Sequence, residues 1–147
     1  MEALVRSAVD AGATVVTGGK RGSGDGGFYF EPTVLRSVRQ DMDVIRREVF
    51  GPVVNLLPYG DFDAVMADVN NSEFGLQAGI YTPDLARAMQ AAQELQVGGV
   101  IINDVPSFRV DHMPYGGNKH SGVGREGPRF AIDEMTTLKM IVINPTA

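Results

Sequence analysis

The chain has 147 residues, of which 44% are hydrophobic and 21% charged, as expected for one ordinary globular domain. Thirteen basic and eighteen acidic residues give a net charge of -5 without a basic stripe, which argues against nucleic acid as a partner. No apolar run reaches the length of a bilayer span, so a membrane helix is excluded and a cytoplasmic protein is expected. The absence of cysteine excludes disulfides, thiolate metal sites and a cysteine nucleophile within these residues.

Local patterns in the opening part of the chain predict one short helix, one brief strand and an extended segment. Apolar residues recur at helical spacing over 2–11, and Gly12 supplies a stop. Residues 13–18 have the pattern of a strand. The glycine-rich run 19–27 predicts a solvated loop, because no Gly-Lys-Ser/Thr ending of a phosphate loop follows. The aromatic and β-branched run 28–35 contains a proline, which predicts an edge strand or an extended segment.

The most informative stretch runs from Arg46 to Pro52. In an extended backbone, residues two apart project to the same side, so Glu48 and Phe50 would present a carboxylate and an aromatic ring together. The following Gly51 permits a tight turn that would aim this pair. A carboxylate has two acceptor oxygens, which match a ribose diol, and a phenyl face packs on a flat heteroaromatic ring. Taken alone, the same residues also fit a surface glutamate beside a core phenylalanine.

Strand and helix patterns alternate after this stretch. Residues 53–57 predict a buried strand and 62–69 a helix capped by Asp61, and a strand, a helix and a strand then follow at 76–82, 84–96 and 99–103. Parallel strands need crossover helices, so this order predicts an α/β fold with a mostly parallel sheet and helices on both faces. Ligands of such sheets gather beyond the carboxyl ends of the strands, which makes Asn103 to Arg109 a candidate site loop.

The last third of the chain contains a dense glycine segment at 113–127 and an apolar tail. Residues 122–127 match the dinucleotide pattern G-x-G-x-x-G, and 128–135 predict a helix after them. That fingerprint also needs a strand directly before it and an acidic residue about twenty positions later, and neither is expected here. The tail, 136–145, has the pattern of a strand without a later partner, so it is expected to seek an edge in its own sheet or in another subunit.

Three separated motifs resemble the NAD(P)-dependent aldehyde dehydrogenase superfamily in their order and spacing. They are Glu48 to Val53, Asn70 to Leu76 and Pro114 to Glu126. The resemblance spans nearly the whole chain and implies the carboxyl-terminal part of a longer polypeptide. On this interpretation, residues 1–135 belong to the catalytic domain and 136–147 form the closing oligomerisation strand.

The resemblance implies NAD or NADP as the cofactor. In the family, the glutamate matching Glu48 binds the hydroxyls of the nicotinamide ribose, and the phenylalanine matching Phe50 contacts the nicotinamide side. Arg47 stands where the family commonly has a second acid. The family's catalytic cysteine, general-base glutamate and dinucleotide-binding domain lie upstream of the matched part, so no catalytic residue is expected in this chain.

The loop 104–108 and Tyr115 resemble the family's lining of the aldehyde tunnel, so Phe108, Arg109 and Tyr115 are the expected substrate-binding residues. The form of residues 108–115 is similar to branches that act on small polar or anionic aldehydes, such as lactaldehyde, phosphonoacetaldehyde and glyceraldehyde 3-phosphate. A guanidinium binds phosphate or carboxylate bidentately. Arg109 is therefore either an anion clamp or a solvated or ion-paired surface arginine.

The function implied by the resemblance is oxidation of an aldehyde to a carboxylic acid, in which a cysteine thiolate attacks, hydride passes to NAD(P)+ and water releases the acid. These residues alone are expected to be inactive, and the complete enzyme to be a homo-oligomer joined through the last strand. One alternative is a stand-alone binding or assembly module that pairs with a related subunit. Another is a phosphate-binding regulatory domain built on 116–127. No metal is expected, because Asp111, His112 and His120 lack a recognised ligand spacing.

Overall fold

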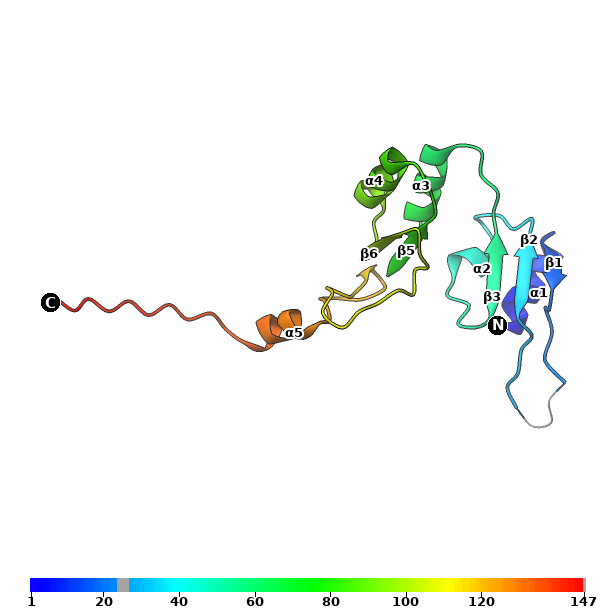
Figure 1. Ribbon diagram of the computed structural model, residues 1–147. Helices are drawn as coiled ribbons and strands as arrows, with labels where there is room; N and C mark the ends of the chain where they lie inside the picture. The colour runs from blue at the N-terminus through cyan, green and yellow to red at the C-terminus, as the bar shows by residue number, and fades with distance from the viewer. Residues whose placement is uncertain (24–26, 147) are drawn as a thin grey trace. The chain divides into compact units, whose positions relative to one another are not determined.

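The computed structural model describes residues 1–23 and 27–146, and the chain divides into two compact units, Met1–Asp68 and Val69–Ala147 (Figure 1). Each unit contains strands and helices of its own. The predicted α/β fold is confirmed. The single, mostly parallel sheet is not found, because the described strands form three small sheets of mixed direction.

The first unit is built on a three-stranded sheet. Its elements are α1 (Glu2–Asp10), β1 (Thr14–Thr17), β2 (Thr33–Arg36), α2 (Asp43–Arg46), β3 (Val53–Leu56) and the first part of α3 (Phe62–Asn70). The strand order is β1-β2-β3, with β1 antiparallel to β2 and β2 parallel to β3. Gly12 has a φ of 102° directly after α1, which confirms the predicted stop.

The strand β2 is the central strand of this sheet, so the predicted edge position was wrong. The proline responsible for that prediction, Pro32, lies one residue before the strand, where its missing N–H interrupts no ladder. Pairing begins at the next residue, since the N–H of Thr33 donates to the carbonyl of Pro52 at 2.8 Å. The buried hydroxyl of Thr33 also accepts from the N–H of Gly19 at 2.8 Å and donates to the carbonyl of Glu31 at 2.7 Å.

One hydrophobic cluster holds the first unit together. Its central member is Leu35 of β2, whose side chain is 0% exposed. Helix α1 contributes Val5 and Ala8, and α2 contributes Val44; the other buried members are Ala13, Val38 and Met42. Because a fully buried leucine contributes about 1.5–3 kcal/mol from the apolar area it removes from water, this cluster is the main source of stability for the sheet.

The strand β3 is half-buried, although its apolar sequence predicted a buried strand. Val53 packs against the cluster, whereas Val54 and Leu56 are 56% and 50% exposed. Burial alternates along the strand, so one face of β3 meets the core and the other face is exposed, as in a sheet that is covered on one side.

The second unit contains a parallel and an antiparallel strand pair. Its elements are β4 (Phe74–Gly75), β5 (Gln77–Ile80), α4 (Leu85–Glu94), β6 (Gly99–Ile102), β7 (Asn118–Lys119) and α5 (Pro128–Met135). The β5-α4-β6 crossover and its parallel pairing confirm the prediction from alternating patterns. Two predicted helix starts are also confirmed, because Asp61 accepts from the N–H of Ala64 and Asp84 from that of Ala86.

The segment that follows α5 has neither helix nor strand over the described residues 136–146. Its apolar side chains are exposed: Leu138 102%, Met140 87%, Ile141 74%, Val142 79% and Ile143 80%. The expected strand has therefore found no edge within the described part of its own chain, and pairing with another subunit stays a prediction. No helix described over 1–23 and 27–146 is long and apolar enough to cross a membrane.

We predict that replacing Leu35 with alanine lowers the free energy of unfolding of the first unit by about 2–5 kcal/mol, because it leaves a cavity in the cluster. The matched substitution Leu56→Ala, on the half-exposed outer side of β3, should cost no more than about 1 kcal/mol. Urea titration followed through the NMR amide signals of β2 measures both values. Equal losses for the two variants would show that Leu35 is not the centre of the core.

Candidate functional site

The segment that connects α2 to β3 carries the predicted cofactor residues. Helix α2 ends at Arg46, and Arg47 already has an extended backbone with ψ at 150°. Val49 packs against the hydrophobic cluster, while the residues on either side of it, Glu48 and Phe50, are exposed. The partly buried Val49 thus lies between two exposed neighbours.

Phe50 combines a highly exposed ring with an uncommon backbone conformation. Its side chain is 87% exposed and its φ is 51°, in the left-handed region. For a bulky residue, this conformation costs roughly 1–2 kcal/mol. Neither the exposure of the ring nor the strain of its backbone stabilises the fold.

Hydrogen bonds anchor this segment to the sheet and to α2. The N–H of Val53 donates to the carbonyl of Gly51 at 2.8 Å, and Pro52 accepts from β2 as described above. On the other side, Asn55 Nδ2 donates to the carbonyl of Val44 at 3.1 Å, which joins β3 to α2. Both ends of the turn that holds Glu48 are therefore fixed to elements of the core.

Arg47 is the residue at which this chain departs from the family pattern. In the structure, its guanidinium Nη1 lies 3.7 Å from Asp43 Oδ2, one helical turn earlier. Both side chains are more than half exposed, so this ion pair contributes about 0–1 kcal/mol. Asp43 therefore partly neutralises the charge of Arg47. Glu48 is the acidic residue nearest to the turn in the sequence.

The predicted substrate residues belong to the second unit and follow β6. Asn103 ends the strand with a φ of 58°, and its Oδ1 accepts from the N–H of Thr82 at 2.8 Å. The loop then turns back, with the N–H of Phe108 donating to the carbonyl of Val105 at 3.1 Å. The side chain of Phe108 is 46% exposed. The loop therefore lies at the carboxyl end of a parallel strand, as predicted.

Arg109 and Tyr115 are brought together, although six positions separate them in the loop. The guanidinium carbon of Arg109 lies 4.3 Å from the centroid of the Tyr115 ring, a cation–π contact. Nη2 of the same side chain lies 2.8 Å from Oε2 of Glu126. Of the alternatives open for Arg109, the structure shows the ion-paired arginine.

Glu126 is the member of this cluster to which the sequence assigned no role. Two backbone hydrogen bonds hold it opposite Tyr115: the N–H of Glu126 donates to the Tyr115 carbonyl at 2.6 Å, and the reverse bond is 3.3 Å. A signal was present, since a lone acid ends a glycine-rich run that also carries Arg125. Only the folding of residues 109–126 onto one another shows that its partner is Arg109.

The glycine-rich segment has a structural explanation. Arg125 donates to the carbonyl of Gly117 at 3.0 Å, to that of Gly124 at 2.7 Å and to Asn118 Oδ1 at 2.6 Å. The G-x-G-x-x-G pattern does not follow a strand directly, because β7 ends at Lys119. These contacts support the structural interpretation of the segment over a phosphate loop.

Gly98 sets the distance between β6 and this segment. Its N–H donates to the carbonyls of Gly75 and Leu76, both at 3.0 Å. A Cβ atom at position 98 would collide with the backbone oxygen of Gly116 and lie 3.0 Å from that of Leu76. Only glycine therefore allows the segment that holds Tyr115 to approach the start of β6 this closely.

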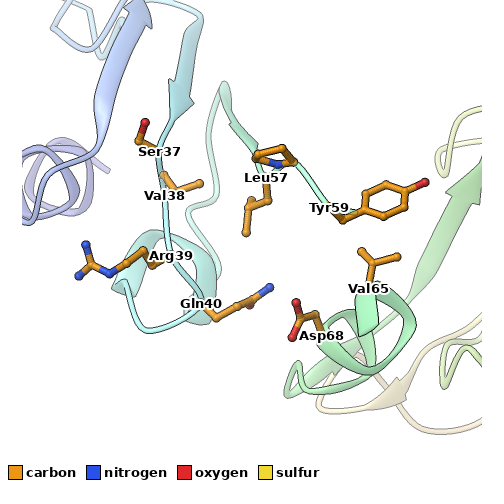
Figure 2. Close-up of a pocket in the computed structure, with 9 residues that line it drawn as sticks. Ser37, Val38, Arg39, Gln40, Leu57, Tyr59, Val65 and Asp68 are labelled. Atoms are coloured by element: carbon orange, nitrogen blue, oxygen red, sulfur yellow. The ribbon is translucent and has the colours of Figure 1, made fainter. Parts of the chain in front are cut away.

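A shallow pocket in the first unit contains none of the predicted site residues (Figure 2). It is lined by Ser37, Val38, Arg39, Gln40, Leu57, Pro58, Tyr59, Val65 and Asp68. Its cation, Arg39, is already engaged, donating to Asp41 at 3.0 Å and to the Ala11 carbonyl at 2.9 Å. The hydrogen bond from Arg39 holds the pKa of Asp41 below its usual value. The arginine thus serves the fold, and the other charged residue that lines the pocket is Asp68.

The exposed carboxylate and ring, together with the arginine and tyrosine that follow a parallel strand, are groups expected in an NAD(P)-dependent oxidoreductase. The chain belongs to the aldehyde dehydrogenase family, whose family model matches residues 1–141. The family resemblance inferred from the three motifs is thereby confirmed.

Known relatives align with nearly all of this chain. The 3-sulfolactaldehyde dehydrogenase of Priestia megaterium is 54% identical over 144 residues, which are 98% of this chain and 29% of that protein. An NAD+ complex of an aldehyde dehydrogenase from Bacillus cereus has a TM-score of 0.91 at 36% identity and covers 99% of this chain and 29% of its own. The NADP complex of a glyceraldehyde-3-phosphate dehydrogenase from Methanocaldococcus jannaschii has a TM-score of 0.89 at 38% identity and covers 97% of this chain and 30% of its own.

The chain thus spans less than a third of the length of these relatives. The two solved relatives hold NAD+ and NADP, in agreement with the cofactors predicted for the complete enzyme. The division between catalytic domain and oligomerisation strand at residue 135 stays a prediction, and so do the roles assigned to individual side chains. Those side chains are Glu48, Phe50, Phe108, Arg109 and Tyr115.

We predict that Phe50→Gly changes the free energy of unfolding by less than about 1 kcal/mol. The ring is exposed, and glycine adopts a positive φ without strain, which offsets its greater freedom in the unfolded chain. The neighbouring Val49→Ala should cost more, about 1–2 kcal/mol, because Val49 packs on the core. Urea denaturation of both variants gives the comparison. A larger loss for Phe50→Gly would assign the ring to the fold rather than to a ligand.

Proposed function

We propose that this chain forms the carboxyl-terminal part of the cofactor and substrate site of a longer aldehyde dehydrogenase, which oxidises an aldehyde to a carboxylic acid with NAD(P)+. The observation that carries the proposal is the pair formed by Glu48 and Phe50, both turned outward by the buried Val49. Membership of the family and the length of the relatives support it.

Glu48 would accept hydrogen bonds from the two hydroxyls of the nicotinamide ribose. Its carboxylate is exposed and forms no hydrogen bond or ion pair with a residue in 1–23 or 27–146. Binding of a ribose would therefore break no interaction of this carboxylate within the described residues. A hydrogen bond to a charged acceptor contributes about 1.5–3 kcal/mol, and two bonds to one carboxylate also fix the orientation of the sugar. NAD(P)+ supplies the hydride acceptor when it is bound.

Phe50 would cover one side of the cofactor near the nicotinamide. Its ring is 87% exposed in the absence of a ligand, and stacking on a flat heteroaromatic ring would remove apolar area from water. The backbone beside the ring is anchored to the core through the hydrogen bond from Thr33 to Pro52, which limits the conformational freedom that this segment would lose when the cofactor binds.

Phe108, Arg109 and Tyr115 would line the entrance for an aldehyde that bears an anionic group. Tyr115 and Phe108 supply apolar surface, and Arg109 supplies a fork of N–H donors that suits sulfonate, phosphate or carboxylate. The names of two relatives, which refer to 3-sulfolactaldehyde and glyceraldehyde 3-phosphate, support a small aldehyde of this kind.

The nucleophile has to come from outside these residues, because the chain contains no cysteine. The purified 147-residue chain is therefore inactive on its own in this proposal. Translating the gene upstream of Met1 in frame is the direct check. A cysteine-bearing segment and a nucleotide-binding domain continuous with this frame support the proposal; a stop codon directly upstream would favour the stand-alone assembly module.

In the longer enzyme, we predict that Glu48→Gln lowers kcat/KM for NAD(P)+ about tenfold or more, because the amide has one uncharged acceptor oxygen in place of the two charged oxygens of the carboxylate. Steady-state kinetics at varied cofactor concentration measure the loss. Glu31→Gln is the matched control, since Glu31 is a partly exposed carboxylate of the same unit whose ion-pair partner is Lys20. Equal kinetics for both variants would remove Glu48 from the cofactor site.

We further propose that residues 136–146 pair with another copy of the chain, which makes the enzyme a homo-oligomer. The observation behind this is the extended backbone with five exposed apolar side chains described above. Such a segment has unpaired N–H and C=O groups along both sides, which another strand satisfies.

We predict that the double substitution Ile141→Asp and Ile143→Asp reduces the oligomer to a smaller species, because it buries two carboxylates in the subunit contact. Size-exclusion chromatography with light scattering gives the mass of each variant. Thr146→Asp, at the far end of the described segment, should leave the mass unchanged. An unaltered mass for the double variant would show that the subunits associate elsewhere.

A further inference from the structure

The cluster around Arg109 holds two groups that bind cations, a ring and a carboxylate. The guanidinium carbon is 4.3 Å from the Tyr115 centroid, and Nη2 is 2.8 Å from Oε2 of Glu126. All three groups belong to the second unit. The arginine assigned to an anionic substrate group is thus already occupied by an anion of the protein itself.

The carboxylate of Glu126 is held beside Arg109 by the backbone. Its residue is bonded to Tyr115 in both directions, and the preceding Arg125 makes three hydrogen bonds that fix the chain at that point. On the other side, Gly127 begins the turn into α5, accepting from the N–H of Ala131 at 2.9 Å. The backbone of Glu126 is therefore fixed beside Arg109.

The ion pair is weak enough to be exchanged. The side chains of Arg109 and Glu126 are 41% and 63% exposed, and exposed pairs of this kind contribute only about 0–1 kcal/mol. A phosphate, sulfonate or carboxylate that takes over the guanidinium meets a second negative charge held close by. The attraction of the arginine is thereby reduced for anionic substrates, while a neutral aldehyde meets a pair whose charges already cancel.

We propose that Glu126 is a specificity-determining residue, which competes with the anionic group of the substrate for Arg109 and so limits the preference for charged over neutral aldehydes. This inference rests on the proposed function, in which Arg109 contacts the substrate. It concerns the ratio between substrates, and it assigns no part in the chemical step to Glu126.

The test compares glyceraldehyde 3-phosphate with glyceraldehyde, which differ only in the phosphate group, in the longer enzyme. Glu126→Gln should raise the ratio of their kcat/KM values about two- to fivefold in favour of the phosphate. The matched control is Glu134→Gln, which removes the same charge from an exposed residue of the same unit and should leave the ratio as it was. Glu126→Asp, whose shorter side chain keeps the charge, gives a smaller rise and serves if the amide variant does not fold.

A second pair of variants tests the role of Arg109 in the substrate site separately from the role of Glu126 as a competitor. Arg109→Gln should lower the ratio, and in that background Glu126→Gln should have no further effect. An unchanged ratio for Arg109→Gln would overturn the role of Arg109 in the substrate site. A lowered ratio for Arg109→Gln together with an unchanged or lowered ratio for Glu126→Gln would overturn the role of Glu126 alone.

Binding to the 147-residue chain gives a readout that needs no catalysis. The Nε–H signal of Arg109 can be followed by NMR during titration with inorganic phosphate. The Glu126→Gln chain should reach half-saturation at a phosphate concentration about two- to fivefold lower than the unaltered chain. Equal half-saturation in both chains would contradict competition by Glu126.

Discussion

The burial of Val49 is the interaction on which the candidate cofactor site depends. This side chain packs on the cluster centred at Leu35, while both of its neighbours in the chain are exposed. The site residues contribute little to this arrangement themselves, because Glu48 and Phe50 are exposed. Positioning comes instead from the core and from the hydrogen bonds that hold Pro52 and Val44. The stability of the first unit and the placement of Glu48 and Phe50 thus have one common source.

Local signals in the sequence were sufficient for most of the helices and strands. The stop at Gly12 and the cap at Asp61 depend only on neighbouring residues, and the structure confirms both. Parallel pairing of β5 with β6 also followed from one short crossover. In each case the residues that decide the outcome lie within one element or one connection.

The errors concern pairings between distant segments. Pro32 suggested an edge for β2, because nothing local shows that the strand begins one residue later and pairs on both sides. The division into three sheets likewise depends on which strands meet. The partner of Arg109 was missed for the same reason, since Glu126 lies beside it only after the intervening loop has folded back. The family resemblance named the arginine and tyrosine, but it carried no information on their mutual contacts.

The small β4-β7 sheet has a consequence for the entropy of the second unit. It pairs Phe74 with Lys119, 45 positions apart (119 − 74), whereas the paired residues of β5 and β6 are separated by about half that distance. Doubling the length of a closed loop costs about 0.6 kcal/mol more, and a ladder of two residue pairs offsets little of it. Side chains supply the remaining stabilisation. Lys119 donates to the carbonyls of Asn70 and Ser72, and the hydroxyl of Ser121 accepts from the N–H of Gly75. The closure of the chain around Tyr115 and Glu126 therefore depends on a few polar side chains rather than on the regular hydrogen bonds of a sheet.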